Sequence, residues 1–153
     1  MIAKRLIDQN INLPKVSAPV ANYLPVTQSG NIVYISGQLP FWEGEKKFLG
    51  KVGHTITIEQ AQEAARLCGL NIIAQLDYHL KGNLDKVVRC LKIGGFVNAI
   101  PDFADHPVVL NGASNLMVEI FGEKGKHARF AMGAASLPFN VAVEVEAMFE
   151  VLL

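Results

Sequence analysis

The C-terminal part of the chain alternates between apolar and polar residues with the period of a β-strand. From residue 141 to 151 apolar side chains occupy one face and the glutamates the other: Val141, Val143, Val145, Ala147 and Phe149 against Ala142, Glu144, Glu146, Met148 and Glu150. Residues 129–135 predict a preceding strand, joined to the last one by residues 136–140 as a β-hairpin. Residues 32–36 read as a short strand that is buried on both faces.

Two long helices are predicted between these strands. The first begins at a capping box formed by Thr57 and Gln60, and its apolar stripe continues to about residue 81. The second spans about residues 107–122, and each helix stops at a glycine, a residue that readily ends helices. Residues 2–9 predict a shorter helix near the start of the chain.

The remaining segments complete the predicted order β-β-α-β-α-β-β. Residues 16–28 predict an irregular edge strand, residues 41–53 a glycine-punctuated loop, and residues 87–97 a strand with a bulge at Gly94–Gly95. Crossover connections of this kind place both helices on one face of a mixed sheet. The uncovered face keeps apolar residues, which favours burial against a partner subunit.

The composition indicates a single domain over residues 1–153. Half of the residues are hydrophobic and only 18% are charged, which again favours an oligomer. Lysine plus arginine equals aspartate plus glutamate at 14 each, so no basic field attracts nucleic acid. The sequence predicts neither a signal peptide nor a membrane span. Because Cys68 and Cys90 read as buried, reduced thiols, we expect a cytoplasmic protein.

Several common catalytic motifs are absent from the sequence. There is no glycine-rich phosphate loop, no Cys-x-x-Cys pair and no His-x-x-x-His pair, so we predict neither a cofactor nor a metal site. Ser114 lacks the flanking glycines of a nucleophile elbow, and we interpret it as a small residue that packs within a helix.

Arg129 is a lone arginine in an otherwise apolar strand. Because an unpaired buried guanidinium is costly, Arg129 must be exposed, be paired, or bind an anion. Glu144 and Glu146 lie two positions apart on one strand face. They form either a solvated face or a functional pair, in which one carboxylate pairs with an arginine and the other transfers protons with a raised pKa.

Four motifs in order and spacing resemble the reactive-intermediate deaminase (Rid) family, also called YjgF-like or L-PSP endoribonuclease-like. The motifs are residues 33–40 (VYISGQLP), Ala128-Arg129, Leu137-Pro138 and residues 143–147 (VEVEA). The resemblance covers about residues 16–151, and residues 18–25 are similar to the longer-chain branch of the family. It implies a chorismate-mutase-like α+β fold with two helices on one face of a mixed sheet. It also implies a homotrimer with a ligand cleft at each of three subunit interfaces.

The family's best-known reaction hydrolyses a 2-imino or enamino acid to a 2-oxo acid and ammonia, without a cofactor. By resemblance, Arg129 matches the arginine that binds the substrate carboxylate, and Glu144 matches the glutamate that positions water or moves its proton. Tyr23 matches a tyrosine at the cleft, and Gly37 matches a glycine whose backbone lies near the ligand. Asn111 matches a family asparagine, with a spacing to Arg129 that differs by one residue.

The chain departs from the family pattern directly after Arg129. The best-characterised deaminases carry serine and then a residue such as cysteine there, whereas this chain has Phe130 and Ala131. Strand alternation predicts that Phe130 points away from Arg129 and that Ala131 points the same way. Two functions therefore remain open: an imine deaminase, or a non-catalytic trimer that binds a small carboxylate metabolite. The neutral charge and the lack of a histidine pair disfavour an endoribonuclease.

Overall fold

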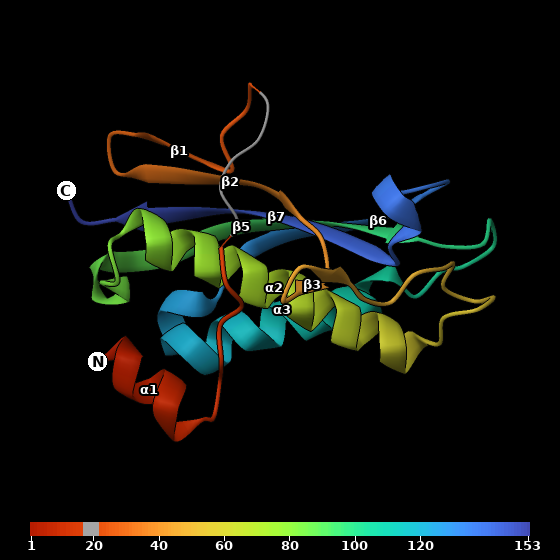
Figure 1. Ribbon diagram of the computed structural model, residues 1–153, viewed down its shortest axis with the longest axis horizontal. Coiled ribbons are helices and arrows are strands. Elements are labelled where there is room, and N and C mark those ends of the chain that lie inside the picture. The colour runs from red at the N-terminus through yellow and green to blue at the C-terminus, as the bar shows by residue number, and fades with distance from the viewer. Residues whose placement is uncertain (17–21) are drawn as a thin grey trace.

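Five strands form a mixed sheet, and the two long helices cover one of its faces (Figure 1). The computed structural model describes residues 1–16 and 22–153. In chain order the elements are α1 (Ile2–Asp8), β1 (Val26–Ser29), β2 (Ile32–Gln38), β3 (Phe41–Trp42), β4 (Glu45–Lys46), α2 (Ile58–His79), β5 (Val87–Asn98), α3 (His106–Phe121), β6 (Ala128–Ala134) and β7 (Val143–Val151). The α+β architecture predicted from the sequence is therefore confirmed.

The strand order in the sheet is β1-β2-β7-β5-β6. Strands β5 and β6 run parallel, because α3 forms the crossover between them, and the other neighbouring strands are antiparallel. The predicted C-terminal hairpin is wrong: β6 is an edge strand paired with β5, and β7 lies between β2 and β5. The alternating pattern of β7 is confirmed, since its apolar face is buried under the helices.

The predicted helices form close to their expected bounds. At the start of α2 the Thr57 hydroxyl accepts from the Gln60 N–H at 3.1 Å, and the Gln60 side chain accepts from the Thr57 N–H at 2.9 Å. Lys81 and Gly82, at φ 56° and 80°, reverse the chain after α2. Helix α3 ends at Gly122, whose φ is 63°.

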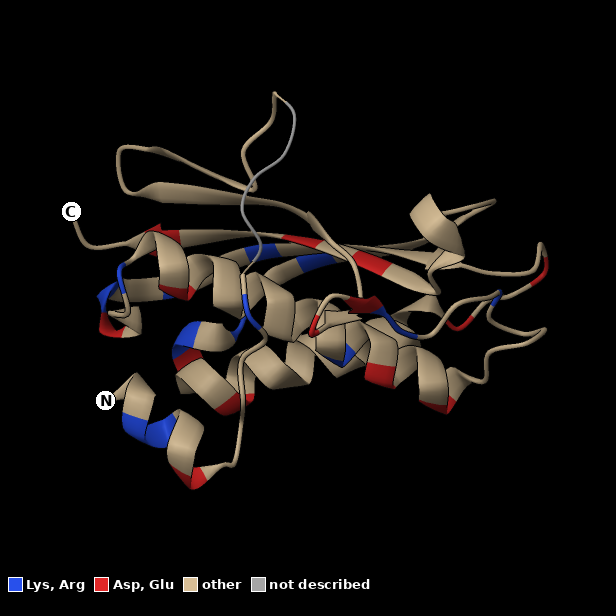
Figure 2. Cartoon of the chain, viewed as in Figure 1, with Lys and Arg blue, Asp and Glu red and all other residues tan. Residues whose placement is uncertain are grey.

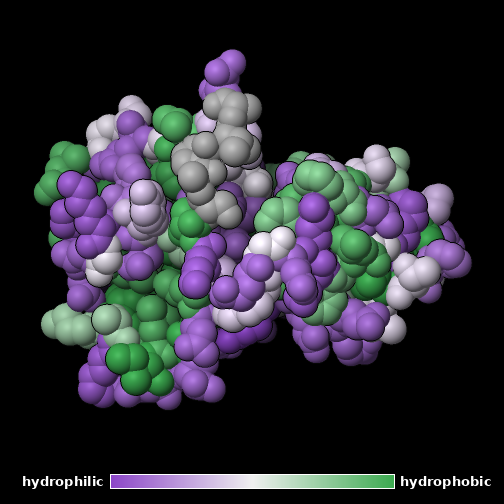
Figure 3. Space-filling model, viewed as in Figure 1, coloured by the Kyte–Doolittle hydropathy of each residue, from purple (hydrophilic) through white to green (hydrophobic). Residues whose placement is uncertain are grey.

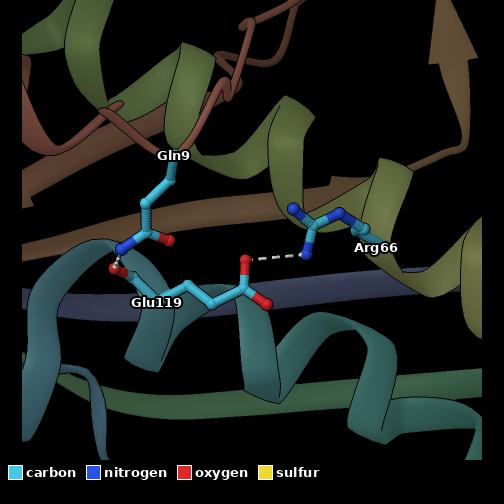
Figure 4. Close-up of polar contacts among 3 residues, drawn as sticks. All are labelled: Gln9, Arg66 and Glu119. Atoms are coloured by element: carbon cyan, nitrogen blue, oxygen red, sulfur yellow. Dashed lines mark hydrogen bonds and ion pairs between the residues drawn. The ribbon is translucent and has the colours of Figure 1, made fainter. Parts of the chain in front are cut away.

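Helix α1 is held against the two long helices by polar contacts (Figure 4). The Gln9 amide donates to the Glu119 carbonyl at 3.0 Å, and the Glu119 carboxylate accepts from Arg66 at 3.0 Å. These contacts join the end of α1 to α3 and, through Arg66, to α2. Figure 2 shows acidic and basic residues interspersed along the chain, as the neutral composition predicts.

Burial in the core favours the protonated form of both cysteines. Cys68 in α2 and Cys90 in β5 are buried and free. Removal from water raises the pKa of Cys90 to about 12, and it raises the pKa of Cys68 as well. Among the described residues, no helix combines the length and apolar character that crossing a membrane requires.

Two predictions about the strands were wrong. Strand β2 is buried on one face only, and its Tyr34 is 43% exposed on the other. The β5 register against β7 shifts between Val87 and Arg89 and again between Cys90 and Lys92, not at the paired glycines. Those glycines are needed for packing instead. A side chain at Gly94 would overlap the Phe130 ring, and a side chain at Gly95 would overlap Leu110.

The two predicted irregular segments differ from expectation in detail. The loop at residues 41–53 contains a small hairpin of β3 and β4. Of the edge strand expected at residues 16–28, only Val26–Ser29 is a strand, and residues 17–21 lie outside the described part of the chain. Residues 18–21, which belong to the segment that resembles the longer-chain branch of the family, also lie outside the described part of the chain.

The face of the sheet opposite the helices carries large apolar side chains. Phe96 and Phe130 pack edge to face at 5.4 Å between ring centroids, and Met132 on β6 is 48% exposed. We call this side the open face. In the view of Figure 3, apolar side chains are exposed among polar ones on the surface of the molecule.

Candidate functional site

Arg129 lies on the helix side of β6 and contacts α3 through three hydrogen bonds. Its Nη1 donates to Asn111 Oδ1 at 2.9 Å and to Ser114 Oγ at 3.1 Å, and its Nη2 donates to the Pro107 carbonyl at 3.4 Å. Among the described residues no carboxylate forms an ion pair with Arg129. The sequence left three options for Arg129: exposure, pairing, or binding of an anion. Pairing with an acidic residue of the same chain is excluded among the described residues.

His127 extends the hydrogen bonds around Arg129. Its Nε2 lies 2.9 Å from Ser114 Oγ, and its Nδ1 lies 2.6 Å from the Gly125 carbonyl. A carbonyl can only accept, so Nδ1 carries the proton and Nε2 of the neutral ring accepts from the Ser114 hydroxyl. The serine oxygen in turn accepts from Arg129. We call Arg129, Asn111, Ser114 and His127 the arginine cluster.

The interpretation of Ser114 as a packing residue was therefore incomplete. Its hydroxyl links Arg129 to His127, and it lies on the same face of α3 as Asn111. The spacing of three residues between Asn111 and Ser114 was the available sequence signal, because positions i and i+3 are neighbours on a helix. His127 carried a similar signal, since it precedes Arg129 by two residues and shares its side of the strand.

Part of the Arg129 guanidinium remains free to bind a ligand. A guanidinium has five N–H donors, and three of them are engaged by Asn111, Ser114 and Pro107. Nε–H and one Nη2–H have no partner among the described residues. Nε and Nη2 form one edge of the planar fork, and an edge of this kind can bind both oxygens of a carboxylate.

Glu144 lies on the open face of the sheet, next to Gly37. Strand β2 bulges between Ile35 and Gln38, and a side chain at Gly37 would collide with the Glu144 carboxylate. Glu144 is half-buried, whereas Glu146 is exposed. Burial, and then the charge of Glu146, raise the pKa of the Glu144 carboxyl above its ordinary value.

Arg129 and Glu144 lie on opposite faces of the sheet. Arg129 pairs with Ile93 of β5, which is fully buried under the helices, and Glu144 pairs with Phe96, on the open face. Because the two β5 positions are three residues apart, an odd interval, their side chains point to opposite sides. Arg129 therefore does not face Glu144 within one chain.

A cleft of about 390 Å³ opens beside Gly37. Its walls include two strongly exposed aromatic residues, Tyr23 and Phe139, at 62% and 63% exposure, together with Phe41 and Lys46. We call it the Gly37 cleft. It brings together Tyr23 and Gly37, whereas Glu144, Arg129 and Asn111 do not line it. Glu144 lies against Gly37 from the open face.

The two residues after Arg129 take the orientations expected from strand alternation. Phe130 covers Gly94 on the open face, and Ala131 pairs with Gly95 on the helix side, where Arg129 also lies. Ala131 presents no hydrogen-bonding group beside Arg129. Among the described residues, no group of three histidine, cysteine or acidic side chains gathers in a way that could hold a metal ion.

Comparison with known proteins identifies the family. Residues 3–151 match the family model described as YjgF/chorismate mutase-like, putative endoribonuclease. The chain belongs to the YjgF/Rid family. Protein TCP17 of Trypanosoma cruzi, a curated relative, is 42% identical over 150 residues, which cover 97% of this chain and 93% of TCP17.

Solved structures share the fold over nearly the whole chain. The protein Atu1372 of Agrobacterium tumefaciens, described as having unknown function, has a TM-score of 0.92 at 45% identity, covering 99% of this chain and 94% of that one. A protein of Shewanella oneidensis described as a putative endoribonuclease has a TM-score of 0.93 at 33% identity, with 99% of each chain covered. The resemblance found in the sequence motifs is thus confirmed.

Proposed function

We propose that this YjgF/Rid protein hydrolyses small reactive 2-imino or enamino acids to 2-oxo acids and ammonia. The observation that carries the proposal is the pair of unengaged N–H groups on Arg129. The guanidinium is held by α3, Nε–H and one Nη2–H have no partner among the described residues, and such groups can donate to a carboxylate. Membership of the family, whose resemblance led us to expect this reaction, supports the same assignment.

The two parts of the site come from different copies of the chain in this proposal. The arginine cluster and Glu144 lie on opposite faces of one sheet, so one chain cannot present both to the same small ligand. Strand β6 lies at an edge of the sheet, and the open face beside it carries exposed apolar residues. Packing that edge against a neighbouring open face would join Arg129 of one copy to the Gly37 cleft of the next in a homotrimer.

Each residue then has a defined role in the reaction. Arg129 binds the carboxylate and holds the C=N carbon for attack, while Asn111 and Ser114 orient the guanidinium. Glu144 accepts a proton from water as the new C–O bond forms and gives it to the imine nitrogen. It then accepts the proton of the new hydroxyl group and gives that proton to the nitrogen as the C–N bond breaks and ammonia leaves. The imine and one water become the 2-oxo acid and ammonia. A half-buried carboxyl with a raised pKa suits such a transfer, because it takes up and releases protons nearer to neutral pH.

A protein with this fold has been seen with an amino acid bound. The structure of Escherichia coli TdcF contains bound serine, and TdcF shares the fold at a TM-score of 0.59 and 21% identity. Serine carries the α-carboxylate that we assign to Arg129.

The second candidate is a trimer that binds carboxylates without turnover. Ala131 favours it, because this position beside Arg129 lacks a hydrogen-bonding group. The two candidates differ in one measurement, the release of 2-oxo acid and ammonia from freshly generated 2-iminobutanoate. We expect the protein to raise the rate above the spontaneous one.

Arg129→Lys should abolish most of this acceleration, since an ammonium cannot reproduce a two-pronged contact. The matched control is Arg89→Lys, at an exposed position of β5, which should act as the wild type does. Carboxylate binding without any acceleration would establish the binding trimer instead. The family description also names an endoribonuclease activity. A salt-dependent titration with RNA should show no binding at physiological salt, given a net charge of zero.

A further inference from the structure

Phe139 combines a strained backbone with an exposed ring. Its φ is 57° and its ψ is 16°, in the left-handed region that large side chains rarely occupy. The ring is 63% exposed, so burial of the side chain does not account for this conformation. Strain of this kind persists only where the surroundings impose it, and it concentrates at functional sites.

Hydrogen bonds on the C-terminal side of Phe139 impose the conformation. Asn140, also at positive φ, accepts from the Gly50 N–H at 2.7 Å through its carbonyl. Its side chain accepts from Asn98 at 3.2 Å, and Asn98 is fully buried and also donates to the Val141 carbonyl at 3.1 Å. Lys51 in turn donates to Asn98 at 2.8 Å. Hydrogen bonds thus fix the buried side of the turn, while the Phe139 ring on its other side stays in contact with solvent.

The fixed ring forms part of the wall of the Gly37 cleft. Tyr23 lines the same cleft, the Phe41 ring centroid lies 6.5 Å from that of Phe139, and Lys46 Nζ lies 4.3 Å from the Phe139 centroid. Glu144 does not line the cleft, but its carboxylate lies against Gly37, which does. If a ligand reacts beside Glu144 and extends past Gly37 into the cleft, the extended part would contact aromatic side chains. Aromatic walls with a few polar groups are typical of pockets that bind planar or apolar groups.

We infer that the Gly37 cleft receives the side chain of the substrate and that Phe139 selects large apolar, above all aromatic, side chains. This inference rests on the proposed function, because it takes the reacting carbon to lie beside Glu144. The substrate class is then the 2-imino acids of aromatic and large aliphatic amino acids. A two-carbon side chain would leave most of the Phe139 ring in water, whereas a benzyl group would cover it.

The test compares two 2-oxo acids that differ only in the side chain. Phenylpyruvate and 2-oxobutyrate are titrated calorimetrically into the wild type and into Phe139→Gly. Glycine adopts positive φ without strain, so this variant removes the ring and keeps the turn. We expect the wild type to bind phenylpyruvate about tenfold more tightly than 2-oxobutyrate, and the variant to lose most of that ratio. Phe139→Tyr should retain the ratio, and so should the control Tyr78→Ala, which removes an exposed aromatic residue of α2 outside this cleft.

Three results would overturn the inference while leaving the proposed function intact. They are equal affinity of the wild type for the two acids, an unchanged ratio in Phe139→Gly, and a loss of trimer mass in that variant, which would make Phe139 an interface residue. A wild type that binds neither acid contradicts the proposed function itself, so the two failures are distinguishable.

Discussion

The carboxylate of Glu144 occupies the space that a side chain at Gly37 would fill. Two strands meet there, because β2 bulges opposite the β7 segment that carries Glu144. The absence of a Cβ at position 37 thus lets an ionisable group rest against an exposed stretch of backbone, at the border of a cleft.

Gly37→Ala should displace the Glu144 carboxylate and lower turnover of an imine, while the fold is retained. The colliding atoms are at the end of a flexible side chain, so we expect a cost of only about 1 kcal/mol in the free energy of unfolding. Denaturant titration and the 2-oxo acid assay measure the two effects. Gly30→Ala is unsuitable as a control, because Gly30 has positive φ. Ser29→Ala at the exposed end of β1 is suitable. Full activity in Gly37→Ala would show that the position of Glu144 does not matter.

Glu144→Gln should lower turnover by about 10² to 10⁴, the usual contribution of a positioned acid or base. Carboxylate binding and oligomeric mass should survive, because the amide keeps the shape of the side chain. The matched variant is Glu146→Gln, whose carboxylate is exposed on the same face of β7. A large loss in Glu146→Gln with none in Glu144→Gln would transfer the role to Glu146.

The raised pKa of Glu144 also predicts how stability depends on pH. Folding favours the protonated carboxyl, so the folded chain binds more protons than the unfolded chain between the ordinary and the raised pKa. Ionised Glu144 therefore destabilises the fold above its raised pKa, and this effect disappears as the pH falls below the ordinary value. Glu144→Gln should melt at a higher temperature than the wild type at pH 7, and the difference should shrink towards pH 4. A difference that does not shrink on acidification would show that ionised Glu144 does not destabilise the fold.

Ser114→Ala should weaken carboxylate binding several-fold without unfolding the chain. It removes one of the two Nη1 contacts and leaves His127 Nε2 without its donor, so the guanidinium is less well oriented. The measurement is the rise in melting temperature with 2-oxobutyrate, which follows RT ln(1 + [L]/Kd). Ser114→Thr keeps the hydroxyl and should restore binding. If Ser114→Ala binds as the wild type does, then Asn111 and the Pro107 carbonyl are sufficient to orient Arg129.

Phe130→Asp should disrupt the predicted trimer. Phe130 lies on the open face against Gly94 and Phe96, and an aspartate buried there in an interface would lack a partner. Light scattering should give a trimer for the wild type at micromolar concentration and a smaller species for the variant. Tyr78→Asp, at a 73% exposed position of α2, serves as the control. A wild type that is a stable monomer would rule out a site shared between copies.

Local patterns in the sequence were sufficient to predict the helices and the two faces of β7. The Thr57–Gln60 capping box, the terminal Gly122 and the alternation from Val143 to Val151 each depend on contacts between residues close in the chain. Side-chain alternation likewise predicted that Phe130 and Ala131 point to opposite sides. The family motifs were short, contiguous segments, and they were sufficient to predict the family.

Pairing between distant segments was decided only by the tertiary structure. Nothing local distinguishes a hairpin from a parallel edge strand for residues 128–134, because the choice depends on the crossover through α3. Whether Arg129 and Glu144 share a face depends on the register of each strand against β5, and a shift of one residue would reverse it. The same holds for Ser114, whose hydroxyl meets Arg129 and His127 only once α3 packs beside β6. The sequence by itself therefore determined which residues are available for chemistry, and the long-range packing of the sheet decided which of them meet.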